Sequence, residues 1–292
     1  MSQKILLDTD IGTDIDDAVC LAYLLAQPAC DLVGVTTVSG EAHERAKMVS
    51  VLCKIAAQDQ IPIFPGVEAP LLAAQRQPFA QQAEALARWD HAIGFPSGEA
   101  INFLRQTIRA HPGEIILLAI GPLTNIALLF ALDRTIPTLL KELVIMGGHY
   151  VNRLAGTHPL EHNIRCDPHA AAIVFNSPVP MRAVGVEVTR RVVMQADEVR
   201  ARFDTELLRP VLDFAEVWFR DIERITFHDP LAAAAIFDAD LCTFERGITS
   251  VELTSEPLRG YTHWQRDDAG WHQVAATVDA AAFFAHFFSV FA

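Results

Sequence analysis

Residues 4–25 read KILLDTDIGTDIDDAVCLAYLL, and this stretch indicates how the chain folds. Ile5 to Leu7 resembles the end of a buried strand, whereas apolar residues recur at helical spacing from Ala18 to Leu25. The stretch therefore predicts a strand, a loop and a helix, and open α/β sheets bind ligands at such strand ends. The loop between them contains five carboxylates, namely Asp8, Asp10, Asp14, Asp16 and Asp17.

Five carboxylates within ten residues repel one another, so they cannot all stay ionised without a positive partner. Raised pKa values or a bound cation would relieve this repulsion, and a hard divalent ion with oxygen ligands is the natural partner. A simpler interpretation is that Asp14 or Asp16 only caps the helix. Capping uses one or two acids and leaves Asp8 and Asp10 unexplained.

Two known acidic motifs fit this loop poorly. A helix-loop-helix calcium loop requires an acid or amide at its fifth position and glycine at its sixth, but here Gly12 is fifth and the loop follows a strand. Aspartyl-phosphate phosphatases carry Asp-x-Asp-x-Thr or Val after a strand. Asp8 and Asp10 fit that pattern, whereas Gly12 occupies the position of the Thr or Val.

The loop resembles the N-terminal signature of the inosine-uridine nucleoside hydrolase family, Asp-x-Asp-Pro-Gly-x-Asp-Asp-Ala after a strand. Ile11 replaces the proline, and two more residues precede the Asp16–Asp17 pair. The resemblance implies that Asp10 and Asp17 bind calcium, that Asp10 is also the base toward water, and that Asp16 binds a ribose hydroxyl.

Three later segments resemble the same family, in the same order along the chain. They are Gly-Pro-Leu-Thr-Asn at 121–125, Glu-x-Asn at 161–163 and His-Asp-Pro at 228–230. The resemblance implies that the Ile120 carbonyl and Asp229 complete the calcium shell. It also implies that Glu161 and Asn163 hold the 5′-hydroxyl and ring side of the sugar, and that His228 protonates a purine leaving group.

Some of these positions have ordinary structural interpretations as well. Asp229 before Pro230 and Asp167 before Pro168 are typical helix N-caps, and Thr124 or Asn125 could cap the helix after the Gly-Pro turn. Glu41 occupies the position where the family commonly supplies an asparagine to the ribose, so it is either a changed sugar contact or a first-turn acid.

The remaining periodicity predicts alternating strands and helices. We expect strands at 31–39, 61–64, 143–146 and 179–186 and after Glu114, and helices at 41–58, from Glu99, after Pro168, at 205–226 and at 279–291. Residues 243–278 resemble a β-ribbon. Residues 71–97 have no firm period and predict a lid or surface excursion, in which only Trp89, Asp90 and His91 are candidates for the site.

Composition limits the class of protein. The 292 residues are enough for one large domain, and 51% hydrophobic with 20% charged residues is a globular balance. A formal net charge of −13 argues against nucleic-acid binding. The five scattered cysteines suit free thiols in a reducing compartment. No run of residues is long and apolar enough for the core of a signal peptide or for a membrane span. We therefore expect a cytoplasmic protein without membrane contact.

Together these observations predict a single α/β domain over residues 1–292, with an open, largely parallel mixed sheet flanked by helices. By resemblance, the expected activity is Ca²⁺-dependent hydrolysis of the N-glycosidic bond of ribonucleosides, in a homodimer or homotetramer. A non-catalytic metal-dependent nucleoside or ribose binder and an aspartate-dependent phosphatase using Asp8 stay open as alternatives.

Overall fold

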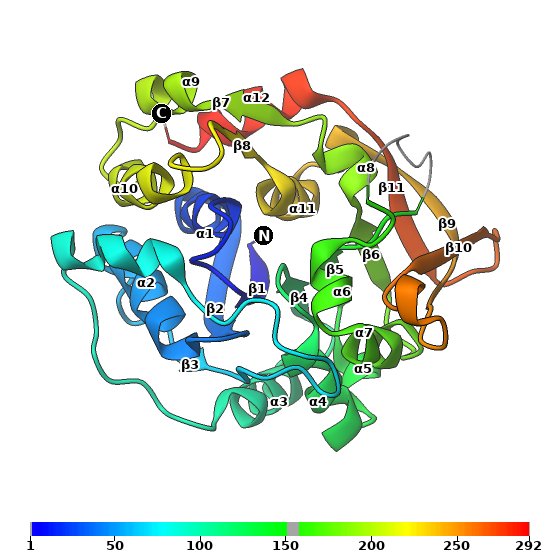
Figure 1. The fold of residues 1–292 in the computed structure, drawn as a ribbon. Helices are drawn as coiled ribbons and strands as arrows, with labels where there is room; N and C mark the ends of the chain where they lie inside the picture. The colour runs from blue at the N-terminus through cyan, green and yellow to red at the C-terminus, as the bar shows by residue number, and fades with distance from the viewer. Residues whose placement is uncertain (1, 151–157, 292) are drawn as a thin grey trace.

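A computed structural model describes residues 2–150 and 158–291. Its centre is a nine-stranded sheet with the order β10-β9-β11-β6-β5-β4-β1-β2-β3, which helices cover on both faces (Figure 1). Two further strands form a small separate sheet. The strands are β1 (Gln3–Thr9), β2 (Cys30–Thr37), β3 (Ile63–Pro65), β4 (Ile115–Ala119), β5 (Glu142–Met146), β6 (Met181–Val184), β7 (Val193–Gln195), β8 (Arg224–Thr226), β9 (Cys242–Val251), β10 (Thr262–Arg266) and β11 (His272–Val278).

The sheet is mixed but largely parallel, as the sequence predicts. β1 pairs in parallel with β2 on one side and with β4 on the other, so that Asp8 lies between Thr36 and Ala119. Only β9 runs antiparallel to its neighbours β10 and β11. Because the chain leaves β1 toward β2 and β3 and later continues from β4 toward β5 and β6, the strand order reverses beside β1. Ligands bind at such a reversal in open α/β sheets.

The helices follow the strands in most cases, as expected for a parallel sheet. They are α1 (Asp16–Ala26), α2 (Ala42–Ile55), α3 (Ala100–Ala110), α4 (Thr124–Leu132), α5 (Ile136–Leu139), α6 (His162–Cys166), α7 (Pro168–Phe175), α8 (Val186–Thr189), α9 (Ala196–Arg202), α10 (Leu208–Trp218), α11 (His228–Phe237) and α12 (Ala280–Ser289), with short 3-10 turns η1 (Gln81–Arg88), η2 (Ala239–Leu241) and η3 (Glu256–Leu258).

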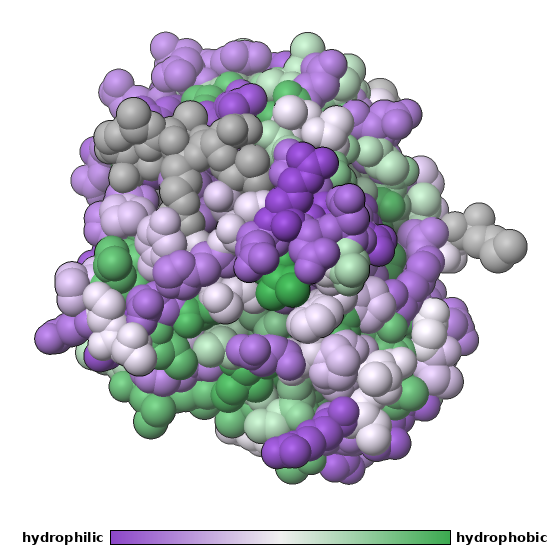
Figure 2. Space-filling model, turned by 90° about the vertical axis from the view of Figure 1, so that its right-hand side faces the viewer, coloured by the Kyte–Doolittle hydropathy of each residue, from purple (hydrophilic) through white to green (hydrophobic). Residues whose placement is uncertain are grey.

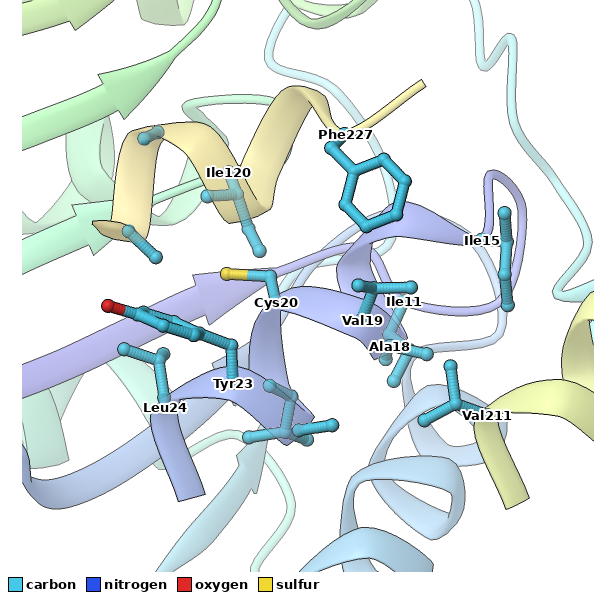
Figure 3. Packing of buried hydrophobic residues seen from close by; sticks show 14 of the residues in the cluster. Ile11, Ile15, Ala18, Val19, Cys20, Tyr23, Leu24, Ile120, Val211 and Phe227 are labelled. Carbon is cyan, nitrogen blue, oxygen red and sulfur yellow. The ribbon is translucent and has the colours of Figure 1, made fainter. Parts of the chain in front are cut away.

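Alternate residues of β1 enter two hydrophobic clusters, one on each face of the sheet. Ile5 and Leu7 join the cluster that contains α1, α10 and α11, whereas Leu6 joins the cluster that contains α3, α4 and α7. Figure 3 shows Cys20 and Tyr23 of α1 beneath α11, and the Tyr23 ring contacts Phe237 at the C-terminal end of α11. This packing holds the N-terminal ends of α1 and α11 next to each other.

Several expectations for local structure were wrong. Residues 205–226 are not one helix, because α10 ends at Trp218 and β8 pairs with β7 through Val193 and Thr226. The expected strand at 179–186 is shortened to β6, and α8 begins at Val186. By contrast, the lack of a firm period in residues 71–97 agrees with the structure, in which they contain only η1 as regular structure.

The capping expectations had mixed outcomes. Leu123 stands at the N-cap of α4 without a side-chain bond, because Thr124 and Asn125 already lie inside that helix. The Asp167 side chain does cap α7, with Pro168 at its first position. The N-cap of α1 is Ile15, so neither Asp14 nor Asp16 caps that helix.

The surface residues and the free cysteines agree with what the amino-acid composition predicts. On the face shown in Figure 2, hydrophilic and hydrophobic residues intermingle. All five cysteines are free. Within residues 2–150 and 158–291, no helix combines the length and apolar character needed to cross a membrane.

Candidate active site

The acidic loop after β1 is a rigid part of the core. Ile11 and Ile15 alternate with the aspartates and are completely buried, so they anchor the loop beneath α1 (Figure 3). Gly12 has φ of +116°, a left-handed conformation that side chains rarely adopt, and a Cβ there would lie 3.0 Å from Ala80 Cβ. Sequence alternation thus directs the apolar residues inward and leaves the carboxylates at the strand end.

The side chain of Arg45 in α2 supports the acidic loop through hydrogen bonds. Its buried guanidinium donates to the carbonyls of Asp10 and Ile11, the latter at 2.9 Å, and to Phe79 O at 3.2 Å. Its Nε donates to Gly40 O at 2.8 Å. One side chain therefore satisfies carbonyls from three separate loops.

Three buried carboxylates converge at the N-terminal ends of α1 and α11. Asp16, Asp17 and Asp229 each offer an oxygen, and these three oxygens lie within 4.8 Å of one another. Burial raises the pKa of all three, and repulsion from neighbouring carboxylates raises it further. A compact group that contains only carboxylate oxygens suits a hard divalent cation such as Ca²⁺, which would relieve the repulsion.

Asp10 lies beside this group. Its backbone N–H donates to Asp17 Oδ1 at 3.2 Å, and the same oxygen accepts from Thr9 Oγ1 at 2.5 Å. A Cβ on Gly121 would lie only 2.7 Å from Asp10 Oδ1, so the Gly-Pro turn after β4 must have glycine at this point. The two turns at the ends of β1 and β4 therefore fit closely around the Asp10 carboxylate.

These carboxylates line a cavity of about 370 Å³. The cavity is large enough for a small organic ligand. Its other walls come from the segments after β5 and β6 and from residues near α10 and α11. The lining residues are Asp10, Thr13, Asp14, Asp16, Asp17, Gln77, Ile120, Met146, His158, Leu160, Glu161, His162, Asn163, Arg165, Val186, Arg190, Trp218, His228 and Asp229.

Glu161 and Asn163 are both buried in the cavity wall. Asn163 Nδ2 donates to Ile120 O at 2.7 Å and to Met146 O at 3.2 Å. The Glu161 carboxylate caps α6 and also accepts from Gly148 N at 2.9 Å. Burial raises the pKa of Glu161, and these backbone donors oppose that rise.

His228 begins α11 and is joined to α8. Its Nδ1 lies 2.6 Å from Thr189 Oγ1. Burial, together with the positive charges of Arg190 and His162, lowers the pKa of His228 to about 3. The imidazole is therefore neutral at neutral pH. The expectation that Asp229 caps this helix was wrong, because the N-cap is Phe227 and Asp229 lies in the first turn.

Four residues named from the sequence lie elsewhere. The Glu41 carboxylate accepts from Ala80 N at 2.8 Å and does not line the cavity. Asp90 pairs with Lys54 at 2.9 Å, Trp89 Nε1 donates to Asp213 at 3.0 Å, and His91 Nδ1 contacts Trp89 O.

Asp8 is buried in the sheet and takes no part in the cavity. Its Oδ1 accepts from Thr36 Oγ1 at 2.5 Å and from Asn125 Nδ2 at 2.7 Å. Burial raises the pKa of Asp8 to about 7. A side chain held this way is poorly placed to attack a phosphate ester, which opposes the phosphatase alternative.

Sequence reasoning missed several residues of the site. Asp14 was named as a member of the acidic cluster and as a possible helix cap but was given no role in the site, yet it lines the cavity, and burial raises its pKa to about 6. Arg190, Trp218 and Gln77 carried no motif. Arg190 could have been suspected, because it follows the end of β6 on the same sheet edge as the acids.

The chain is similar to known proteins along nearly its whole length. The family described as inosine-uridine preferring nucleoside hydrolase matches residues 5–285. A probable uridine nucleosidase 2 of Arabidopsis thaliana is 30% identical over 309 aligned positions, which cover 96% of this chain and 94% of the relative. The pyrimidine-specific ribonucleoside hydrolase RihB of Escherichia coli is 28% identical over 277, covering 89% of this chain and 86% of the relative.

A solved structure shows the same arrangement. The plant nucleoside hydrolase PpNRh1 superposes with a TM-score of 0.81 at 25% identity, and the match covers 100% of both chains. The structural match and the family match therefore agree with each other over all the segments that form the cavity.

Proposed function

The chain belongs to the inosine-uridine preferring nucleoside hydrolase family, and from this membership we propose that it is a calcium-dependent ribonucleoside hydrolase. The reaction cleaves the N-glycosidic bond and gives ribose and free base. The observation that carries the proposal is the group of Asp16, Asp17 and Asp229, whose oxygens lie within 4.8 Å of one another in a cavity of about 370 Å³.

The ligand set is taken from the family resemblance, and the grouping of Asp17 with Asp229 supports it. Asp10, Asp17 and Asp229 with the Ile120 carbonyl would hold Ca²⁺. A carbonyl oxygen has two lone pairs, so Ile120 O can accept from Asn163 and still bind an ion. When bound, the ion polarises water and organises sugar hydroxyls.

The chemical step is assigned to Asp10 as general base. Its carboxylate takes a proton from the attacking water, whose oxygen bonds to C1′ while the bond from C1′ to the base breaks. The sugar develops positive charge as the base departs. The carboxylates of Asp14 and Asp16 lie in the same cavity and would stabilise that charge electrostatically.

The sugar is assigned to three residues. Asp16 would accept a hydrogen bond from a ribose hydroxyl, and Glu161 with Asn163 would hold the ring side and the 5′-hydroxyl. Glu41 is the remaining sugar candidate from the sequence, although its carboxylate accepts from Ala80 N and does not line the cavity. His228 would contact the leaving base as a neutral imidazole, since its pKa is about 3.

A non-catalytic nucleoside binder is the second candidate function. The observation that favours it is the position of Glu41, whose carboxylate is turned away from the cavity toward Ala80. Such a protein would keep the ion and the sugar contacts without turnover.

One experiment separates these functions. Purified protein with Ca²⁺ is offered inosine, adenosine, uridine and cytidine, and ribose release is followed with a reducing-sugar assay. We expect release that stops with a chelator and returns with added Ca²⁺. A nucleoside that raises the melting temperature without releasing ribose would instead identify a binder.

The assembly and location are proposed as well. We expect a homodimer or homotetramer in the cytoplasm. Light scattering on the purified protein tests the first, and fractionation of the source cells tests the second.

A further inference from the structure

The cavity combines acidic residues with cationic and aromatic ones. Arg165, Arg190, His158 and His162 line it together with Trp218. Within the described parts of the chain, the guanidinium groups of Arg165 and Arg190 have no carboxylate partner and no hydrogen bond. A permanently charged side chain without an anion, next to a ligand cavity, is available for negative charge on a ligand.

Arg190 lines the cavity from the segment that follows β6. It directly follows α8, and its backbone N–H donates to Val186 O at 3.2 Å, which fixes where the side chain starts. The preceding residue, Thr189, bonds to His228 Nδ1 at 2.6 Å. His228 in turn precedes Asp229 of the acidic group, so one side-chain contact links the segment that carries Arg190 to the start of α11.

Trp218 supplies an aromatic surface to the same cavity. Its Nε1 donates to Arg224 O at 2.9 Å, so the polar edge of the indole is occupied and its ring is held in place. An aromatic ring, an imidazole and a guanidinium form a suitable environment for a planar, electron-rich heterocycle. The carboxylates, by contrast, suit the hydroxyl-bearing sugar and its developing positive charge.

We propose that Arg190 is a catalytic residue that binds the leaving base and stabilises the negative charge that the base gains. This inference rests on the proposed function. As water oxygen bonds to C1′, the electron pair of the C1′–N bond moves onto the base. The base departs as an anion paired with the guanidinium and then takes a proton from solvent water, while Asp10 loses its proton to solvent.

The same residue determines a substrate class. Arginine presents five N–H donors and no acceptor, so it matches carbonyl oxygens and not amino groups. Uracil and hypoxanthine place negative charge on carbonyl oxygens when they leave as anions. Arg190 should therefore contribute more to the turnover of nucleosides of such oxo-bases than to that of adenosine.

The test varies the leaving group. Arg190→Met is compared with the parent protein on uridine and on p-nitrophenyl β-D-ribofuranoside, whose phenolate needs little stabilisation. We expect kcat on uridine to fall by about 10²-fold, as for loss of one charge-stabilising donor. The loss on the nitrophenyl substrate should be at least ten times smaller, and Arg190→Lys should recover part of the uridine activity.

Arg165→Met is the matched control, because it removes the same charge from the same cavity. A general electrostatic effect would appear in both variants and for both substrates, whereas the proposal requires selective loss in the Arg190 variant alone. Equal losses on the two substrates, no loss on uridine, or the same selectivity in Arg165→Met would overturn it. A parent protein that releases neither product would instead reject the proposed function itself.

Discussion

The backbone N–H of Asp229 donates to Asp16 Oδ2 at 3.0 Å, although 213 positions of sequence separate the two residues. This bond joins the first turn of α11 to the first turn of α1. Both helices direct their N-terminal ends at the acidic group, and the positive end of a helix favours nearby negative charge. Helix packing therefore both positions the three carboxylates and offsets part of their repulsion.

Asp10→Asn should abolish most activity while the protein stays folded. The amide cannot accept the proton from water, and loss of a general base costs at least ~10²-fold in turnover. The reducing-sugar assay and a thermal melt check the two halves of this prediction. Asp268→Asn, which changes an exposed carboxylate on the β10–β11 turn, is the control. Full activity in the Asp10 variant would exclude it as the base.

Calcium affinity should increase with pH. The pKa values of the ligands Asp17 and Asp229 are raised by burial and by neighbouring carboxylates, so protons compete with the ion in mildly acidic solution. Calorimetric titration at pH 5 and pH 8 measures this change and the protons released on binding. An affinity that stays constant between these two values would contradict a ligand set that contains Asp17 and Asp229.

Calcium affinity should increase with pH, whereas the stability of the metal-free protein should decrease as the pH rises. A carboxyl with a raised pKa in the folded state binds its proton more tightly there than in the unfolded chain. Its contribution is therefore complete below about pH 4 and is lost as the pH rises through the folded-state value. Asp229→Asn removes one such group.

Melting temperatures in chelator at several pH values check this prediction. The difference between Asp229→Asn and the parent protein should grow in favour of the variant as the pH rises from about 4 toward neutral. Added Ca²⁺ should cancel that advantage, because only the parent gains stability from the ion. A variant that is less stable than the parent at every pH in chelator would refute the assumed repulsion.

Sequence reasoning correctly predicted those elements in which the local apolar pattern matches the burial of the residues in the structure. Ile5 to Leu7 and the apolar repeat from Ala18 to Leu25 form β1 and α1 as expected. The acidic loop could be placed because it lies between these two elements at a strand end. The position of Asp229 beside it was suggested only by family resemblance, since no local pattern relates α11 to α1.

The sequence predictions failed where contacts between residues far apart in the chain determine the local structure. Helical spacing continues from Thr205 to Thr226, yet β8 forms because Ile225 and its neighbours pair with β7. Arg190 and Trp218 enter the cavity through packing of α8 and α10 and carry no sequence signal. Glu41 was named by its position in a motif, but the Ala80 amide determines where its carboxylate lies.

Arg45→Met should destabilise the protein strongly, because it removes a completely buried guanidinium. Methionine fills a similar volume but leaves the carbonyls of Asp10, Ile11 and Gly40 without their donor. Unsatisfied buried carbonyls cost about 1–3 kcal/mol each before relaxation, so we expect a loss of about 3 kcal/mol or more in the free energy of unfolding. Denaturant titration measures it, with the exposed Arg134→Met as control. A loss below about 1 kcal/mol would show that the loop holds its shape without Arg45.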